Sequence, residues 1–251
     1  MGWLWWALRD RIAPLHPIML PQARASLTGK YGLEIGGPSR IFTPRGALPV
    51  YAWAERLDNV NFAADTAWGR GLRDGSPFVF SRHKPPGIQW IREAGCLHGV
   101  SDQSFDFVVS SHCLEHLANP LGALQEWRRV TWTGGCLLVI LPDPARTFDH
   151  RRPLTTLEHL REDQAQCTPE NDRTHFAEVL TLHDLGLDPG AGSPAAFVVR
   201  VGDNAAQRCV HHHVFDEALL DAALRETGWS PIAIERFAPI HIGALAREET
   251  S

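Results

Sequence analysis

The segment over residues 32–39 has the sequence Gly-Leu-Glu-Ile-Gly-Gly-Pro-Ser, which predicts a short strand running directly into a glycine-rich turn. The strand covers residues 33–35 and carries an acid, Glu34. Gly36 and Gly37 follow it and permit backbone conformations and close approaches that a Cβ atom would prevent. Turns of this kind occur at the carboxyl ends of strands in open α/β sheets, where such sheets form binding crevices. The segment therefore favours an α/β fold with a site beyond Ile35.

A second pattern, between residues 104 and 143, places a helix between two buried strands. Residues 105–110 and 137–141 are short apolar runs, and a Gly-Gly turn precedes the second of them. Pro120–Val130 has apolar residues at positions 121, 124, 127 and 130, close to the spacing of one helix face. Alternation of this kind predicts a Rossmann-like, mostly parallel sheet with helices on both faces.

The remaining segments complete one domain. We expect a helical lead-in over residues 1–29 and a single domain over residues 30–251, with a second strand at residues 48–53 and a short or missing first crossover helix. Residues 66–90 are rich in glycine and proline and predict an irregular excursion with a short hairpin around Phe78. An irregular polar insertion is expected over residues 143–213. A helix then begins after Asp216 and ends near Gly228. A strand is expected at 232–237, and a short apolar stretch follows at 240–245.

Charge and cysteine content limit the partners and the compartment. The 251-residue chain has a net charge of -5 and no run of lysine or arginine, so we expect no nucleic-acid partner. Its five cysteines form no Cys-x-x-Cys pair, which favours a reducing, cytoplasmic compartment. The apolar run that includes Trp3 and Trp6 is too short to span a bilayer. We expect it to dock on the domain or to contact a membrane peripherally.

The strand, helix, Gly-Gly turn and strand of residues 104–143 resemble the second half of class I S-adenosylmethionine-dependent methyltransferases. The resemblance implies S-adenosylmethionine as cofactor and a methyl-transfer activity. It assigns a set of residues to the cofactor side: Glu34, Gly36, Gly37, Ser39, Asp58, Leu97 and Ser111. Asp58 is the expected partner of the ribose hydroxyls, with Glu55 as the alternative.

Two departures from the family pattern affect this interpretation. Cys96 stands where many members have an acid that holds the adenine amino group, and Trp132 and Thr133 replace the usual Lys-Pro before the Gly-Gly turn. A catalytically degenerate member that only binds a ligand or a partner is therefore an alternative to an active enzyme.

His112, Glu115 and His116 also form the His-x-x-Glu-His pattern of one group of zinc proteases. The pattern places two imidazoles one helical turn apart, as a metal requires. Here it follows the strand at residues 105–110 directly instead of lying within a helix. A zinc hydrolase is therefore the weaker alternative, and no metal ligands are assigned.

The polar segment after residue 141 begins at the same sheet edge, so we assign it to the methyl acceptor. The expected substrate-binding residues are Asp143, Asp149, Arg151 and Arg152. An imidazole is suited to take a proton from an acceptor hydroxyl at neutral pH, and His112 and His150 are the candidates. The acceptor is expected to be a small molecule or a glycan. The triplet His211 to His213 precedes the helix near 216, and one member is expected to point back toward the site.

Overall fold

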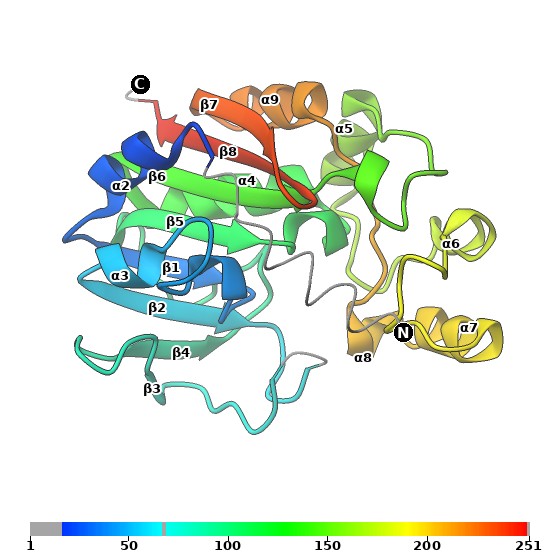
Figure 1. Ribbon diagram of the computed structural model, residues 1–251, viewed down its shortest axis with the longest axis horizontal. Helices are drawn as coiled ribbons and strands as arrows, with labels where there is room; N and C mark the ends of the chain where they lie inside the picture. The colour runs from blue at the N-terminus through cyan, green and yellow to red at the C-terminus, as the bar shows by residue number, and fades with distance from the viewer. Residues whose placement is uncertain (1–16, 67–68, 250–251) are drawn as a thin grey trace.

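The computed structural model describes residues 17–66 and 69–249, and its central element is one eight-stranded sheet of order β3-β4-β2-β1-β5-β6-β8-β7 (Figure 1). The strands are β1 (Tyr31–Ile35), β2 (Arg56–Asn61), β3 (Pro77–Phe78), β4 (Gly87–Ile91), β5 (Phe105–Ser111), β6 (Thr131–Pro142), β7 (Trp229–Phe237) and β8 (His241–Glu248).

Five neighbouring strands, β4, β2, β1, β5 and β6, run parallel. The two edges of the sheet are antiparallel: β3 pairs with β4, β8 with β6, and β7 with β8. The predicted mostly parallel α/β sheet is confirmed. In Figure 1 the carboxyl ends of the parallel strands point toward the right of the view, so the loops that leave them gather at one edge.

Helices cover both faces of this sheet, as predicted. The α-helices are α2 (Leu20–Leu27), α3 (Val50–Trp53), α4 (Pro120–Val130), α5 (Leu157–Gln166), α6 (Phe176–Leu182), α7 (Pro194–Gly202), α8 (Asn204–Gln207) and α9 (Glu217–Glu226). Short 3-10 turns, η1 (Arg40–Phe42), η2 (Leu114–His116) and η3 (Pro144–Arg146), follow β1, β5 and β6.

The alternation of side chains along the strands divides the core in two. Leu33 and Val108 face the layer that contains α4 and α9, where Trp127 is fully buried. Phe107 and Leu138 face the opposite layer, which contains α2 and α3. Adjacent residues of a strand point to opposite faces, so a strand buried on both sides needs apolar residues at successive positions, as β5 and β6 have.

The predicted second strand was wrong. Most of residues 48–53 form the helix α3, and the second strand is β2. A short apolar run fits a buried strand and a buried helix turn equally well, and here Val50, Tyr51 and Trp53 are buried from a helix. The expected short first crossover is confirmed, because only η1 and α3 lie between β1 and β2.

The two insertions contain more regular structure than the sequence indicated. The hairpin around Phe78 is confirmed as β3 and β4, but β4 is also a full member of the parallel sheet beside β2. Residues 143–213 include the helices α5 to α8, and α6 and α7 enclose a small apolar cluster with Phe197 and Val201 at its centre. In Figure 1, α6, α7 and α8 lie beyond the carboxyl ends of the strands.

The remaining predictions near the chain ends have mixed outcomes. Helix α9 begins after Asp216, as expected, and the Asp216 side chain accepts a hydrogen bond from the Leu219 amide at 2.8 Å. The expected strand follows as β7, and the apolar stretch after it forms the further strand β8. In the lead-in, α2 is a helix. Trp3 and Trp6 lie outside the described residues. In the part of the chain that the structure describes, no helix is both long and apolar enough to cross a membrane.

Gly32 in β1 provides a test of the packing between β1 and β5. A Cβ atom at this position would lie 2.1 Å from the Phe107 ring, so Gly32→Ala forces a displacement in a fully buried layer. We expect a loss of about 1–3 kcal/mol in the free energy of unfolding, measured by chemical denaturation. If the clash is the cause, the loss in the Gly32→Ala/Phe107→Leu double variant is smaller than the sum of the two single losses. Additive losses would contradict this account.

Candidate functional site

A cavity of about 380 Å³ opens at the carboxyl edge of the sheet, above β1, β2, β4 and β5. Its walls come from the loops that leave these four strands, together with one residue of the insertion. The residues used below are Gly36, Ser39, Asn61, Phe62, Glu93, Ser111, His112, His116 and Arg208. The predicted meeting of the glycine turn with the tip of the strand that begins at Phe105 is confirmed, because Gly36 and His112 line the same cavity.

The glycine turn takes a course that an ordinary side chain would obstruct. Gly36 has a positive φ of 80°, and a Cβ atom there would lie 3.3 Å from Cys113 at the end of β5. The Gly36 amide donates to the Val60 carbonyl oxygen at 2.8 Å. The turn thus crosses the end of β2 and leaves backbone exposed along one wall of the cavity.

Glu34 stabilises this turn from within the protein and does not line the cavity. Its buried carboxylate accepts hydrogen bonds from the Ser39 amide and the Tyr51 hydroxyl, each at 2.8 Å. Gly37 is needed at this point because a Cβ atom there would lie 2.2 Å from the Glu34 carboxyl carbon. Of the four residues that the sequence assigned to the turn, Gly36 and Ser39 line the cavity, while Glu34 and Gly37 support them.

Burial is the larger influence on the ionisation of Glu34. It raises the pKa of the carboxyl from 4.5 to about 7, although the hydrogen bonds from Ser39 and Tyr51 act in the opposite direction. Folding therefore favours the protonated form of this acid.

The expected ribose acid, Asp58, lies elsewhere. It is buried within β2 and accepts hydrogen bonds from the Ile88 amide and the Trp90 indole at 2.9 and 3.0 Å. The end of β2 presents Asn61 to the cavity instead. Glu55 is exposed before the strand begins, so neither acid is at the site.

The loop after β4 places an acid at the cavity where the sequence comparison assigned none. Glu93 lines the cavity, whereas Cys96 is exposed. Leu97 is fully buried in the core and does not reach the cavity, contrary to its assignment. Glu93 was missed because the sequence comparison placed the acid directly before Leu97, at Cys96. The acid stands four residues before the leucine instead.

Arg208 of the insertion closes one side of the cavity. Its guanidinium contacts Glu93 at 2.7 Å and Glu170 at 2.5 Å, and its carbon Cζ lies 5.0 Å from the centre of the Phe62 ring. The insertion thus contributes directly to the wall of the cavity.

The end of β5 supplies the imidazole nearest the cavity. Ser111 and His112 both line it, as predicted, and His112 has a positive φ of 51° that turns it out of the strand. His112 Nε2 lies 2.9 Å from His241 Nδ1 at the start of β8. Burial, with the neighbouring His241 and His211 as lesser causes, holds the pKa of His112 well below 6.5, so the ring is neutral at physiological pH.

A buried carboxylate, Glu115, lies beside His112 and faces two further imidazoles. Its Oε1 is 3.8 Å from His112 Nδ1 and 3.9 Å from both His116 Nε2 and His211 Nε2. His211 Nδ1 in turn lies 2.5 Å from Asp149. The prediction that one member of the histidine triplet points toward the site thus applies to His211.

The polar residues of the segment after β6, which the sequence assigned to the methyl acceptor and to the base, do not reach the cavity. His150 and Arg151 both contact Asp184 at 2.8 Å on the surface of the insertion. Arg152 is buried and contacts Asp149 and Glu178 at 3.0 and 2.7 Å. None of these residues lines the cavity.

Asp143 also differs from its predicted role. It caps the turn η3, where its side chain accepts from the Ala145 amide, and it contacts Arg236 at 3.3 Å. Of the predicted substrate-binding residues, only Asp149 connects to the site. Its carboxylate contacts His211, which in turn faces Glu115.

The zinc-protease arrangement is not formed. His112 ends β5 and contacts His241, whereas His116 ends η2 and its Nδ1 contacts the Val210 carbonyl oxygen at 3.0 Å. Three other groups in the described part of the chain bring potential metal ligands within 4.8 Å of one another: Glu115, His116 and His211; His159, His175 and His213; Asp172, His175 and His212.

The comparisons with known proteins agree with this architecture. Residues 76–139 match the family described as a methyltransferase domain. The structure of an S-adenosylmethionine-dependent methyltransferase from Methanosarcina mazei aligns with a TM-score of 0.52 at 13% identity, over 92% of this chain and 98% of the other. One from Mesorhizobium loti aligns with a TM-score of 0.50 at 16% identity, over 91% and 97%. The chain has the class I methyltransferase fold. A comparison with curated proteins finds no significant match.

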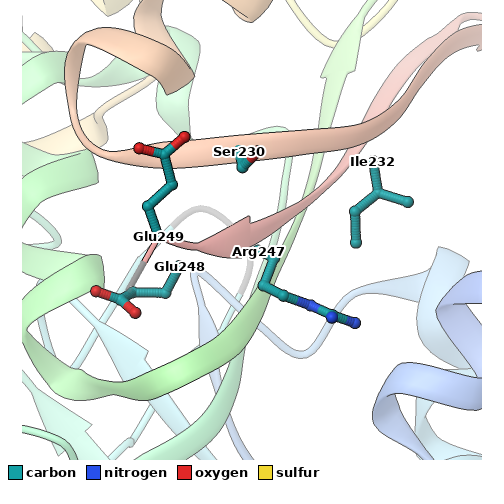
Figure 2. Close-up of a pocket in the computed structure, with 5 residues that line it drawn as sticks. All are labelled: Ser230, Ile232, Arg247, Glu248 and Glu249. Carbon is teal, nitrogen blue, oxygen red and sulfur yellow. The ribbon is translucent and has the colours of Figure 1, made fainter. Parts of the chain in front are cut away.

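In this methyltransferase fold, a second hollow, of about 500 Å³, lies at the opposite edge of the sheet (Figure 2). It is lined by the first residues of β7 and the last of β8, which end on the amino side of the parallel strands. In Figure 2, Arg247 points away from Glu248 and Glu249, so the charged groups do not converge on a ligand. This hollow is therefore a weaker candidate for a ligand site than the cavity at the carboxyl edge.

The raised pKa of Glu34 predicts a pH-dependent stability. The folded-state pKa of about 7 exceeds the ordinary 4.5, so the folded state binds a proton that the unfolded state has released. Stability associated with Glu34 is therefore full below pH 4.5 and is lost as the pH rises through 7. Between pH 4.5 and 8, the unfolding free energy of the wild type relative to Glu34→Gln should fall by about 3 kcal/mol. A difference that is constant across denaturation measurements at these pH values would refute the assignment.

Proposed function

We propose that this protein is an S-adenosylmethionine-dependent methyltransferase that acts on a small hydroxylated molecule or a glycan. The observation that carries the proposal is the cavity at the carboxyl edge, whose wall is a glycine turn with exposed backbone and whose rim holds a neutral imidazole. The fold and the family match of residues 76–139 support the same reaction class.

The residues at the cavity suit a nucleoside of this kind. Its volume of about 380 Å³ is within the range of small-molecule sites. Asn61 at the end of β2 donates one side-chain N–H to the Gly37 carbonyl oxygen and would offer the second to a ribose hydroxyl. Glu93 after β4 offers a carboxylate to the adenine amino group. Gly36, Ser39 and Ser111 would hold the remaining part of the cofactor, which supplies a methyl group on a sulfonium centre when bound.

His112 is the proposed general base toward an acceptor hydroxyl. The 2.9 Å contact between His112 Nε2 and His241 Nδ1 holds one N–H. In the tautomer in which His112 Nε2 donates it, His112 Nδ1 is the unprotonated nitrogen that acts as the base. His112 lines the cavity and is neutral, and it can therefore accept the proton that the hydroxyl loses. His241 orients the ring, and Glu115 lies beside its other nitrogen.

Cofactor binding provides the first test. Isothermal titration with S-adenosylhomocysteine should show micromolar binding to the wild type. Ser111→Leu fills part of the cavity and should weaken binding at least tenfold, about 1.4 kcal/mol. Ser101→Leu, on the exposed amino side before β5, is the matched control and should bind like the wild type. Absence of binding to the wild type would reject the cofactor and favour a degenerate, non-catalytic member.

The base is tested by turnover once an acceptor is identified with labelled cofactor and fractionated cell extract. His112→Ala should lower turnover by about 10² or more while S-adenosylhomocysteine still binds. His98→Ala removes an exposed imidazole outside the cavity and serves as the control. His150→Ala should have little effect, because His150 contacts Asp184 on the surface. Wild-type turnover in His112→Ala would remove this residue from the mechanism.

The pH profile gives an independent check on the same residue. His241, Glu115 and His211 face His112 from β8, η2 and the segment after α8. Burial, with His241 and His211 as lesser causes, holds the pKa of His112 well below 6.5. A base works unprotonated, so turnover should fall as the pH decreases through this pKa and stay constant above 6.5. An acid limb centred above 6.5 would contradict the assignment.

A further inference from the structure

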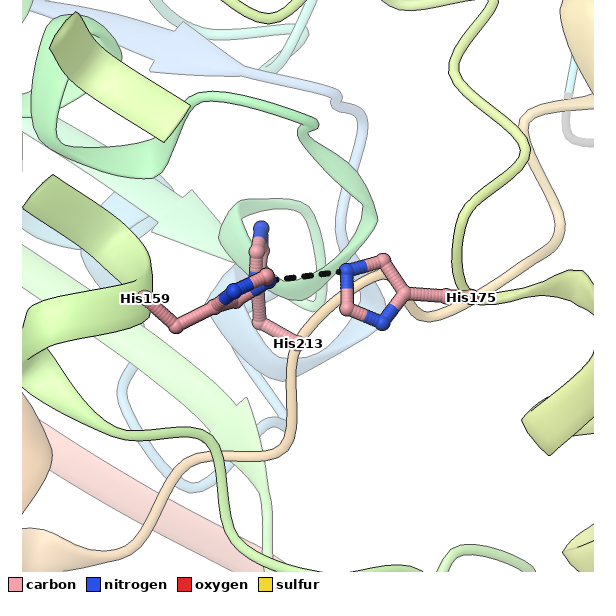
Figure 3. Close-up of side chains that lie close together, drawn as sticks. All are labelled: His159, His175 and His213. Atoms are coloured by element: carbon pink, nitrogen blue, oxygen red, sulfur yellow. Dashed lines mark hydrogen bonds between the residues drawn. The ribbon is translucent and has the colours of Figure 1, made fainter. Parts of the chain in front are cut away.

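Away from the cavity, three histidines from distant parts of the sequence converge on one point (Figure 3). His159 lies on α5, His175 immediately precedes α6, and His213 lies between α8 and α9. Figure 3 shows the three rings directed toward a common centre. Asp163, one helical turn after His159, adds a carboxylate to the group.

The separations within this group match those of metal ligands. His159 Nε2 is 3.1 Å from His175 Nε2 and 3.4 Å from Asp163 Oδ2, and His213 Nε2 is 3.6 Å from the same oxygen. Zn–N and Zn–O bonds of 2.0–2.2 Å in a tetrahedron place the ligand atoms about 3.3 Å apart. In the neighbouring group of Glu115, His116 and His211, the carboxylate oxygen lies 3.9 Å from a nitrogen of each imidazole, farther from this value.

Hydrogen bonds within the group do not account for all of its polar atoms. Asp163 Oδ2, which lies 3.4 and 3.6 Å from nitrogens of His159 and His213, is buried and has no hydrogen-bond partner. The nitrogen of His213 that faces it, Nε2, has a long contact of 3.4 Å with the Ala118 carbonyl oxygen. Leaving a carboxylate oxygen unsatisfied is costly, so its retention beside three imidazoles calls for a cation. The other carboxylate oxygen of Asp163 accepts from the Thr168 hydroxyl at 3.0 Å, which fixes its orientation as an outer partner of a metal ligand does.

The residue types also suit a cation. Imidazole nitrogens and carboxylate oxygens are both ligands of zinc, and three imidazoles with one carboxylate supply the four ligands of a tetrahedral site.

We propose that His159, Asp163, His175 and His213 bind a zinc ion that joins α5, the start of α6 and the segment before α9. The site is separate from the proposed methyl transfer and does not depend on it. A metal at this site would stabilise a limited region of the fold. His213 also donates its backbone N–H to the Glu115 carbonyl oxygen at 3.2 Å, so this region includes the segment beside the cavity. The metal would thus hold the insertion against the acceptor side of the cavity.

Metal content and affinity test the proposal directly. Protein prepared without a histidine tag, loaded with zinc and dialysed, should contain one zinc ion per chain by mass spectrometry. Replacement by cobalt should give the intense visible absorption of a four-coordinate site. Competition with a chromophoric chelator should show at least about 100-fold weaker zinc binding in His159→Ala and in Asp163→Asn, since even outer partners contribute 10- to 100-fold.

Two further variants make the test specific. His98→Ala removes an exposed imidazole and should keep wild-type affinity. His212→Gln disrupts the neighbouring group of Asp172, His175 and His212, and it should also retain zinc. Circular dichroism establishes that each variant is folded, and His159, with about a third of its side chain exposed, is the substitution least disruptive to the core. Zinc-free wild type after loading, or full zinc affinity in both ligand variants, would overturn the proposal.

Discussion

The register of β1 between its two parallel neighbours determines where the site forms. Ile35 is level with Val60 of β2 and with Ser110 of β5, so the next residue of each strand emerges at the same height. Those three residues are Gly36, Asn61 and Ser111, and all three line the cavity. A shift of one residue in either pairing would turn the side chains to the opposite face and separate these groups. The position of the cavity is therefore a consequence of strand pairing.

Buried polar groups hold the turn at the top of this sheet in place. Glu34 fixes the Ser39 amide from one side. From the other, the Asn61 side-chain amide donates to the Gly37 carbonyl oxygen at 2.9 Å, and Asn59 and Gln89 complete the network between β2 and β4. Hydrogen bonds of this kind are stronger in the protein interior than in water and polarise one another. The network therefore specifies one path for the backbone that the cofactor would contact.

Some segments of this structure could be predicted from the sequence and others could not, because the segments carry different physical signals. The strands β5 and β6 and the helix α4 bury continuous or one-face apolar surfaces, so their patterns identified them. Strand β2 was missed because Asp58, Asn59 and Asn61 are buried through hydrogen bonds that hydropathy does not reveal. Glycine and serine positions near the site followed from the turn, but the roles of Glu34 and Glu93 depend on which way a side chain points, which spacing alone does not determine.

The insertion explains why the acceptor side was the least predictable part. Its polar residues pair mainly with one another, as Arg152 does with Asp149 and Glu178, so exposure to a ligand could not be inferred from polarity. The consecutive histidines of the triplet separate in space: His211 faces Glu115, His212 contacts Asn204, and His213 faces Asp163. One extended segment thereby links the candidate active site to the proposed zinc site. A displacement of this segment would alter both sites. The position of Glu115 is therefore coupled to the packing of the helices around the proposed zinc site.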